Sequence, residues 1–191
     1  MSCIVTHDVY LRGRCGAGEI CLRPASDEDI PLLCQLNRDP RALIWSSESE
    51  EPYTEEMVRQ IWGYVSPMAL CFIIEVEGVP VGDCWLQKMN LPQVIARYPE
   101  GTDIRRIDMS IGRVDYWGQG VGTAMVKLLT EYAFTAEGAD VLHCMCDSRN
   151  TRSDRIWKRL GFELVWKDEP GCYENHYALS REAYLCRKNE Q

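Results

Sequence analysis

The feature that most constrains this chain is a glycine-rich turn that leads directly into an amphipathic helix. Glycine occupies the alternate positions 118, 120 and 122, and the helix expected from Val121 carries one continuous apolar stripe. Glycine lets a backbone approach a bulky ligand closely, and the free N–H groups at the start of a helix favour an anion. The pattern predicts a main-chain cradle for a pyrophosphate.

Two common nucleotide-binding motifs do not fit this turn. A P-loop requires G-x-x-x-x-G-K-[ST], and no lysine precedes Thr123. A dinucleotide-binding fingerprint opens a βαβ unit, whereas this G-x-G-x-G segment follows strands that are expected to be antiparallel. A glycine-rich turn that binds no ligand remains the alternative when the turn is considered alone.

The remaining sequence pattern predicts a single mixed α/β domain over residues 19–184. Residues 1–18 are expected to form a loose or strand-like leader, and residues 185–191 a C-terminal tail. A loop is expected around Pro92. Apolar and β-branched segments predict strands at 20–23, 69–77, 79–88, 104–111, 141–146, 162–166 and 173–179. Capping residues and apolar periodicity predict helices at 27–37, at 54–64, from 121 onward and at 150–160.

Charge and composition exclude several classes of partner. The 191 residues include 21 Lys and Arg against 29 Asp and Glu, so the net charge is −8 and the pI is near 5.0. Such a chain is not expected to bind nucleic acid or anionic lipid, because both require a basic face. No apolar run approaches the roughly 20 residues that a membrane helix needs. The N-terminus lacks a signal-peptide pattern, so a cytoplasmic location is expected.

The ten cysteines are interpreted as reduced thiols within apolar segments, because no CxxC pair occurs. His143, Cys144 and Cys146 have the ligand chemistry of a zinc site. Ligands spaced along a single strand rarely converge on one ion, however, so no metal is expected.

The glycine turn and its neighbours together resemble a known enzyme family. A strand, the turn, the amphipathic helix, a further strand, Asn150, a helix and Gly161-Phe162 follow one another as in the acetyl-CoA-binding half of the GCN5-related N-acetyltransferases (GNAT). The resemblance spans roughly residues 19–184. It implies the GNAT fold, a mixed central β-sheet flanked by helices. It also implies acetyl-CoA as co-substrate, bound where two central strands splay apart.

The resemblance assigns the cofactor-binding residues. The end of the strand before the turn offers main-chain groups to the pantetheine and the acetyl carbonyl, the turn binds the pyrophosphate, and the start of the next helix contacts the CoA arm. In this sequence the corresponding residues are Ser110, Ile111, Gly112, Trp117, Gly118, Gln119, Gly120, Val121, Gly122, Thr123, Asn150 and Ser153. Trp117 replaces the Arg or Gln of many family members.

Within this family the chain is most similar to the aminoglycoside 6′-N-acetyltransferases. The segment 106–111, Arg-Ile-Asp-Met-Ser-Ile, resembles their G-[IM]-D-Q-x-[IL], with Asp108 twelve residues before the middle glycine. Asp147 and the segment 150–153, Asn-Thr-Arg-Ser, resemble their aspartate and Asn-x-Arg-Ala. The chain departs from the branch at Met109, where a glutamine is expected, and lacks further acids after the strand pair.

The reaction itself makes Asp108 the first catalytic candidate. A primary amine is largely protonated at pH 7, so a nearby group must accept its proton before the nitrogen attacks a thioester. An ordinary Asp has a pKa near 3.9 and is a weak base. Asp108 is therefore expected to bind and orient the ammonium, and to accept its proton transiently or pass it to water. The alternative role is an ion pair with Arg105 or Arg106.

Other residues are expected to bind a polycationic acceptor such as an aminoglycoside. Asp147 is a candidate clamp for a second ammonium group, and capping of the helix at Asn150 is its alternative role. Trp45 and Glu48 lie in an aromatic and acidic segment that is expected to form the acceptor wall. A solvated acidic loop is the alternative there.

The proton donor to the departing thiolate is less well defined. Family members often place a tyrosine on the helix after the asparagine, but Trp157 occupies that position and cannot act as an acid. Tyr173, Tyr177 and water are the alternatives.

Three functions are compatible with these patterns. The favoured one is an aminoglycoside N-acetyltransferase that modifies the 6′ amine and confers antibiotic resistance. The second is a protein N-terminal acetyltransferase of the ribosomal-protein type. The third is a non-catalytic CoA-binding module, which the missing tyrosine favours. An exposed strand near residues 162–179 is also a candidate surface for a homodimer.

Overall fold

The computed structural model describes residues 2–46, 51–169 and 173–189. Its contacts divide the chain into two compact units. The first contains residues 1–87 and 109–128, and the second contains residues 88–108 and 129–191. The predicted acceptor residue Glu48 lies outside the described residues.

Helices and strands are interspersed along the chain, as the mixed α/β pattern predicts. The strands are β1 (Leu11–Cys15), β2 (Gly18–Pro24), β3 (Ala69–Val76), β4 (Val79–Lys88), β5 (Ile104–Ser110), β6 (Val141–Cys146), β7 (Glu163–Lys167) and β8 (Asn175–Ser180). The helices are α1 (Ile30–Leu36), α2 (Pro40–Ser46), α3 (Glu55–Val65), α4 (Pro92–Ile95), α5 (Val121–Thr135), α6 (Thr151–Arg159) and α7 (Arg181–Asn189).

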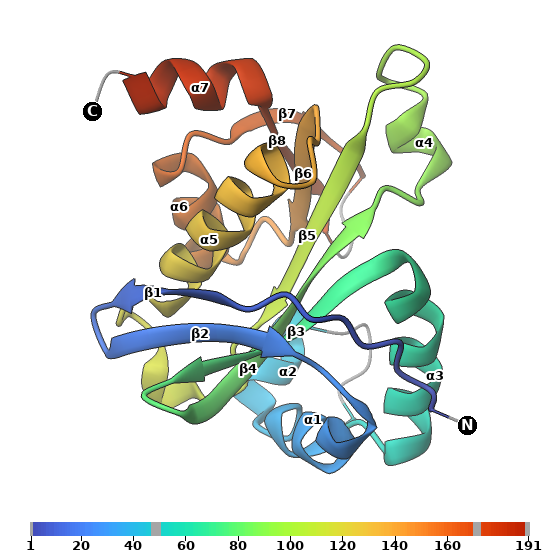
Figure 1. The fold of residues 1–191 in the computed structure, drawn as a ribbon, viewed down its shortest axis with the longest axis vertical. Coiled ribbons are helices and arrows are strands. Elements are labelled where there is room, and N and C mark those ends of the chain that lie inside the picture. The colour runs from blue at the N-terminus through green and yellow to red at the C-terminus, as the bar shows by residue number, and fades with distance from the viewer. Residues whose placement is uncertain (1, 47–50, 170–172, 190–191) are drawn as a thin grey trace. The chain divides into compact units, whose positions relative to one another are not determined.

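The first unit contains the antiparallel strands β1, β2, β3 and β4, in that order (Figure 1). Gly78, in a left-handed conformation with φ of 75°, closes the turn between β3 and β4. Part of the predicted leader is itself a strand, because β1 pairs along its whole length with the start of β2, from Leu11↔Leu22 to Cys15↔Gly18.

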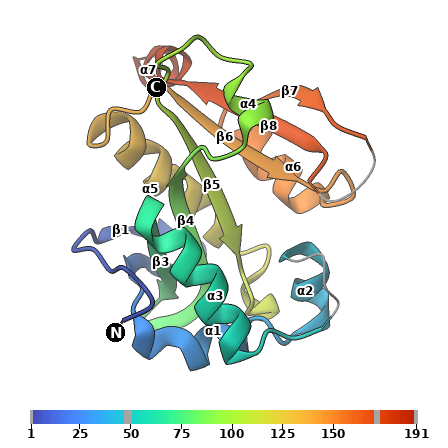
Figure 2. The same cartoon turned by 90° about the vertical axis from the view of Figure 1, so that its right-hand side faces the viewer.

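Helices α1 and α3 cover one face of this sheet (Figure 2). Their apolar sides form a buried cluster with two strand residues, Cys71 and Ile73. Thr54 caps α3, since its side-chain oxygen accepts a hydrogen bond from the Met57 N–H at 3.2 Å.

The apolar stripe predicted for α5 is its buried side: Val121, Met125, Leu129 and Ala133 are each at most 1% exposed.

The second unit contains strands in the order β5, β6, β8 and β7. Strands β5 and β6 are parallel, and their pairing covers only three positions, from Ile104↔Val141 to Arg106↔His143. Both strands continue beyond this point, β5 to Ser110 and β6 to Cys146. The splay predicted between two central strands is therefore found between β5 and β6, and Asp108 follows the last paired residue of β5 by two positions.

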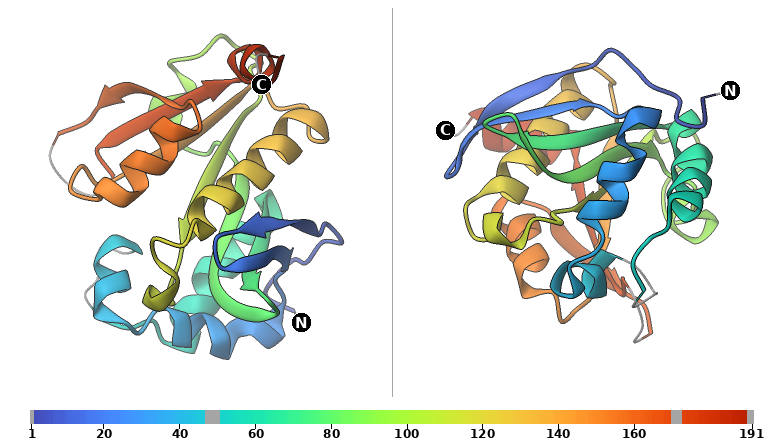
Figure 3. Two further views of the ribbon diagram at one scale, coloured as in Figure 1. Left: turned by 90° about the vertical axis from the view of Figure 1, so that its left-hand side faces the viewer. Right: turned by 90° about the horizontal axis from the view of Figure 1, so that it is seen from below.

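Helix α6 runs beside β7 and β8 (Figure 3) and buries Trp157, which packs edge-on against Phe162 with ring centroids 5.2 Å apart.

Three polar side chains of the second unit are linked by hydrogen bonds. His143 Nε2 lies 3.0 Å from His176 Nδ1, and His176 Nε2 lies 2.9 Å from Asp168 Oδ2. The His143 ring thus has a histidine partner, and the described residues contain no cluster of three metal-ligating side chains.

Three helices appear where the sequence pattern indicates none. Helices α2 and α4 begin at Pro40 and Pro92 and span 7 and 4 residues. These lengths are too short for apolar periodicity to be recognised. Helix α7 includes most of the tail expected at 185–191. None of its residues is buried, so its sequence has no apolar stripe from which a helix could be predicted.

Strand β7 lies at the end of the strand order, and Leu164 and Val165 are both more than 40% exposed. A homodimer through this edge stays a prediction. No helix in the described ranges has the length and apolar character needed to cross a membrane.

Candidate active site

The glycine turn, residues 118–123, is exposed at positions 118–120 and buried at Val121 and Gly122, and its backbone is shaped as an anion cradle. Gly118 and Gly120 both adopt left-handed conformations, with φ of 77° and 78°. The first hydrogen bond of α5 runs from the Ala124 N–H to the Gly120 oxygen at 2.9 Å. The three amides before Ala124 therefore have no acceptor within the helix. A Cβ built at Gly118 meets nothing within 4 Å, so a pyrophosphate has room to approach these N–H groups.

The β1–β2 hairpin supports this turn from within the first unit. A Cβ at Gly16, in the hairpin loop, would lie 2.7 Å from the Gln119 carbonyl oxygen, and a Cβ at Gly120 would lie 3.5 Å from the Gly16 nitrogen. The Gln119 side chain also donates a hydrogen bond to the Asp115 carbonyl oxygen at 2.6 Å. The predicted leader thus contributes directly to the shape of the predicted cofactor site.

The strand end that precedes the turn is fixed by close backbone contacts. A Cβ at Gly82 of β4 would lie 2.2 Å from the Ser110 oxygen, and one at Gly112 would lie 2.1 Å from the Leu36 oxygen at the end of α1. Only glycine permits these approaches. The indole Nε1 of Trp117 donates to the Ile111 carbonyl oxygen at 2.8 Å. The segment expected to meet the pantetheine is therefore held at both ends.

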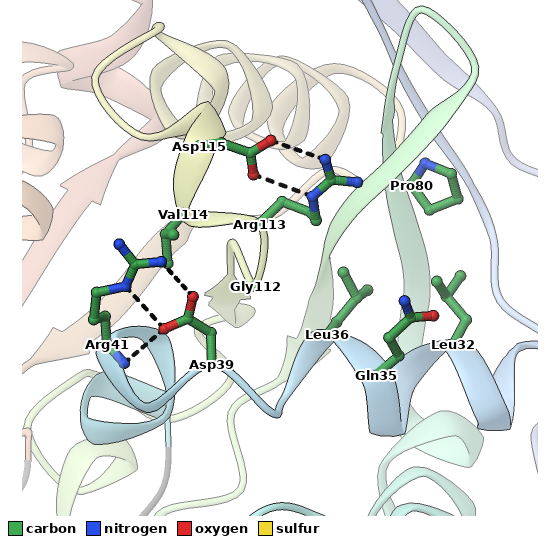
Figure 4. Close-up of a pocket in the computed structure, with 10 residues that line it drawn as sticks. All are labelled: Leu32, Gln35, Leu36, Asp39, Arg41, Pro80, Gly112, Arg113, Val114 and Asp115. Atoms are coloured by element: carbon green, nitrogen blue, oxygen red, sulfur yellow. Dashed lines mark hydrogen bonds and ion pairs between the residues drawn. The ribbon is translucent and has the colours of Figure 1, made fainter.

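A pocket of about 410 Å³ opens beside this segment (Figure 4). Two ion pairs face it: Arg41 with Asp39, at 2.7 Å, and Arg113 with Asp115, at 2.8 Å. Each arginine lowers the pKa of its partner carboxyl. The lining residues are Leu32, Gln35, Leu36, Asp39, Arg41, Pro80, Gly112, Arg113, Val114 and Asp115. Its volume is within the range of small-molecule sites.

A row of side chains on β4 with buried polar atoms is not predicted from the sequence. Asp83, Trp85 and Gln87 alternate along the strand and so share one face. Among the described residues, eight buried side-chain polar atoms have no hydrogen-bond partner, and four of them belong to this row: Asp83 Oδ2, Trp85 Nε1, Gln87 Nε2 and Gln87 Oε1. Native proteins satisfy most buried polar atoms, so this concentration marks a face of β4 with unmet hydrogen-bonding demand.

The row faces the side of the sheet that α1 and α3 cover. Asp83 lies directly opposite Ile73 in the β3–β4 register, and Ile73 belongs to the cluster under these helices. Trp85 packs edge-on against Trp62 of α3 with ring centroids 5.4 Å apart. Burial raises the pKa of the Asp83 carboxyl to about 7. The available sequence signal was a carboxylate in the middle of an otherwise apolar strand.

In the second unit the two predicted acceptor carboxylates are already ion-paired. Asp108 Oδ2 accepts a hydrogen bond from Arg106 Nε at 2.6 Å, which is the alternative role expected for it. Asp147 is largely buried and accepts hydrogen bonds from both the backbone N–H and the guanidinium of Arg149. That guanidinium lowers the pKa of the Asp147 carboxyl. An ammonium group has to compete with an arginine at either position.

The start of α6 is held by its own side chains. Asn150 caps the helix, and its side-chain oxygen accepts from the Ser153 N–H at 3.2 Å. The Ser153 hydroxyl accepts from the Trp157 indole at 2.9 Å. The Tyr177 hydroxyl is buried and donates to Asp154, and burial together with that carboxylate raises the pKa of Tyr177. Contact of Asn150 and Ser153 with CoA stays a prediction, as does the acceptor role of Trp45 on α2.

Comparison with known proteins decides the family. The model of the acetyltransferase (GNAT) domain matches residues 19–163, which is more than half of the chain. The chain belongs to the GNAT family. It is an acetyl-CoA-dependent N-acetyltransferase, and the mixed α/β fold class predicted from its sequence is confirmed.

Relatives within the GNAT family act on different amines. The chain is 24% identical over 149 residues to the spermidine N(1)-acetyltransferase of Escherichia coli K12, covering 78% of this chain and 75% of that protein. It is 25% identical over 164 residues to the aminoglycoside N(6′)-acetyltransferase type 1 of Klebsiella pneumoniae, covering 81% of each. The structure of the aminoglycoside acetyltransferase AAC(6′)-Ib with coenzyme A superposes with a TM-score of 0.76 at 18% identity, covering 88% of this GNAT chain and 99% of the other.

Proposed function

We propose that this enzyme transfers the acetyl group of acetyl-CoA to a primary amine of an aminoglycoside, at the 6′ position, and so confers resistance. The observation that carries the proposal is the polar row on β4, where Trp85 and Gln87 bury N–H donors that have no partner. Aminoglycosides bring hydroxyl and ether oxygens that accept such hydrogen bonds. A protonated polyamine offers only N–H donors between methylene groups and leaves the Trp85 indole unsatisfied.

The cofactor is assigned to the glycine turn and the strand end before it. The free amides at the start of α5 suit the pyrophosphate, and the open space at Gly118 admits it. Main-chain groups from Ser110 to Gly112 receive the pantetheine arm and the acetyl carbonyl. When bound, acetyl-CoA supplies the activated acyl group, and these residues hold it in place for attack by an amine.

Carboxylates that suit a polycation are assigned to the acceptor. Asp108 and Asp147 of the second unit take ammonium groups in exchange for their arginine partners. The acceptor roles of Trp45 and Glu48 stay predictions from the sequence. Exchange is easier at Asp147, because the Arg149 side chain is 75% exposed and can swing into solvent, and ion pairs with exposed arginines contribute only about 0–1 kcal/mol. The Arg106 side chain is 16% exposed, so its displacement from Asp108 costs more.

A protein N-terminus is the second candidate acceptor. The row from Asp83 to Gln87 spans about 13 Å at the rise of an extended strand. An extended peptide has main-chain carbonyl groups that satisfy the Trp85 and Gln87 donors equally well. The amine at its N-terminus then takes the place of the 6′ amine.

Acetylation assays with three acceptors test these assignments. Purified protein is incubated with acetyl-CoA and kanamycin, spermidine or a basic peptide, and the release of free CoA thiol is followed. The proposal expects turnover with kanamycin at a kcat/KM at least tenfold above that for spermidine, and mass spectrometry should locate the acetyl group on the 6′ amine. Preference for the peptide or for spermidine overturns the aminoglycoside assignment. Calorimetric binding of CoA without turnover of any acceptor identifies a non-catalytic module instead.

A further inference from the structure

We propose that Asp83 is a catalytic residue of this enzyme: its carboxylate accepts the proton that the acceptor ammonium loses before acetyl transfer. This inference rests on the proposed acetylation of a primary amine. It assigns a role to the acid on β4 that neither the sequence pattern nor the family resemblance singled out.

The surroundings of Asp83 are unusual for a carboxylate. The residue is only 9% exposed, and its Oδ2 atom has no hydrogen-bond donor within the described parts of the chain. The facing residue on β3 is Ile73. Acids are almost never buried without a partner, because desolvation of the charge is costly. A ligand that brings a positive charge removes this cost.

Among the residues that the structure describes, no charged group is found to compensate Asp83. The buried members of the cluster under α1 and α3 are apolar apart from the thiols of Cys34 and Cys71. On β4 itself, Cys84 is the adjacent titratable group, and the charge of Asp83 adds to the effect of burial in raising the pKa of that thiol. The raised pKa of Asp83, about 7, has burial as its cause. A base poised near the working pH is the most effective kind.

The β4 backbone beside Asp83 contacts the segment to which the acetyl group is assigned. Its neighbour Gly82 approaches so closely that a Cβ there would stand 2.2 Å from the Ser110 oxygen and 3.0 Å from the Ile111 Cα. Trp85 and Gln87 continue along the same face and provide the hydrogen bonds that would orient the rest of the acceptor. By contrast, Asp108 already holds the Arg106 guanidinium at 2.6 Å.

In the proposed step, the ammonium group of the acceptor donates one proton to the Asp83 carboxylate, which becomes a neutral acid. The neutral nitrogen then forms a bond to the acetyl carbonyl carbon, and the bond between that carbon and the CoA sulfur breaks. The sulfur leaves with the electron pair and takes up the second proton lost by the nitrogen. Asp83 returns its proton to solvent, so one proton is released per turnover.

The test compares Asp83→Asn with Asp108→Asn and with Asp8→Asn, a control on an exposed segment of the same unit. Asp83→Asn keeps the size of the side chain and removes the base. We expect its kcat/KM for the amine to fall at least 100-fold, the usual contribution of a general base. Its calorimetric Kd for CoA should change less than twofold, and Asp8→Asn should match the wild type. Asp83→Asn with more than one third of the wild-type kcat/KM overturns the inference.

The pH profile separates a proton acceptor from a structural residue. With a strongly basic amine as acceptor, wild-type kcat/KM should rise as pH passes through about 7, the pKa of Asp83, and should fall above the pKa of the amine. The rise near 7 should be absent from Asp83→Asn and present in Asp108→Asn. If Asp83→Asn does not fold, the pH profile of the wild type decides alone. A wild-type kcat/KM that keeps rising up to the pKa of the amine, without levelling above pH 7, overturns the inference. Failure of the wild type to acetylate any amine instead refutes the proposed function.

Discussion

The indole of Trp117 donates a hydrogen bond to the Ile111 carbonyl oxygen at 2.8 Å and so ties the glycine turn to the end of β5. Many relatives are expected to carry Arg or Gln at this position. In this enzyme the Trp117 side chain instead links the two ends of the segment 111–117 through this hydrogen bond. The two predicted parts of the cofactor site, Ser110–Gly112 and the glycine turn, are thereby held together within one unit.

Replacing Trp117 should loosen this connection. Trp117→Phe retains a ring and loses the N–H, and a typical hydrogen bond contributes about 1 kcal/mol. We expect CoA to bind about fivefold more weakly by calorimetry. Tyr64→Phe, at an exposed position on α3, should leave the affinity unchanged. Unaltered affinity in Trp117→Phe would show that the link plays no part in cofactor binding.

The left-handed conformation of Gly120 should be required for binding and not only for stability. Gly120→Ala and Gly138→Ala introduce a side chain at φ values of 78° and 69°, and neither added Cβ clashes with a neighbour. Both variants should lose about 1 kcal/mol of unfolding free energy. Only Gly120→Ala should lose CoA affinity, by tenfold or more in a calorimetric titration. Equal affinities in the two variants would contradict a role for the turn.

Gly82 should tolerate no side chain. A Cβ there meets main-chain atoms of Ser110 and Ile111, which cannot rotate away. We expect Gly82→Ala to lower the unfolding free energy in urea by about 3 kcal/mol, as overpacking does in a tight core. Gly78→Ala, in a turn with open space around it, should cost about 1 kcal/mol. A smaller loss in Gly82→Ala than in Gly78→Ala would mean that β4 and the end of β5 are not packed this closely.

The buried histidines should make the protein less stable in acid. Burial, and after it the nearby His176 and Arg106, lower the pKa of His143 from 6.5 to about 3, and burial also lowers that of His176. Below pH 6.5 the unfolded chain therefore binds more protons than the folded one. The contribution of His143 to the unfolding free energy should fall by about 2 kcal/mol between pH 7 and pH 5.

A variant isolates this effect from other titrations. Asp83 has the opposite effect on stability, because its folded pKa of about 7 lies above the ordinary value of 3.8. The folded state therefore binds more protons than the unfolded chain between these two pH values. Asp168 and Arg97 also adjoin the histidine pair. His143→Gln preserves an N–H that can donate to His176 and should flatten the loss between pH 7 and pH 5. Urea titrations at pH 7 and pH 5 measure this loss of unfolding free energy. If His143→Gln loses as much as the wild type, the effect does not come from His143.

The proton of the departing thiolate should not come from Tyr177. Its hydroxyl is buried and donates to Asp154, and its pKa is raised. Tyr177→Phe should keep kcat within threefold of wild type while the unfolding free energy falls by about 1 kcal/mol. Tyr173→Phe in parallel examines the other tyrosine candidate. A hundredfold loss of kcat in Tyr177→Phe would restore Tyr177 as the acid.

Local patterns predicted much of the fold. Strong apolar periodicity gave α5, and β-branched runs gave β3 and β4 within one or two residues of their observed ends. These signals depend only on neighbours in the chain, so they survive without tertiary information. The short helices α2 and α4 and the polar helix α7 carry no such signal, and their formation depends on their surroundings.

The glycine turn, its left-handed residues and its position before α5 follow from the sequence, because glycine conformation and helix-end geometry are local properties. The tertiary structure decided the electrostatic roles. Asp83, Asp108 and Asp147 are the same residue type, yet one is buried without a partner and two are paired with arginines. A carboxylate's partner and its access to water are set by strands and helices distant in sequence, and no spacing rule along the chain contains that information.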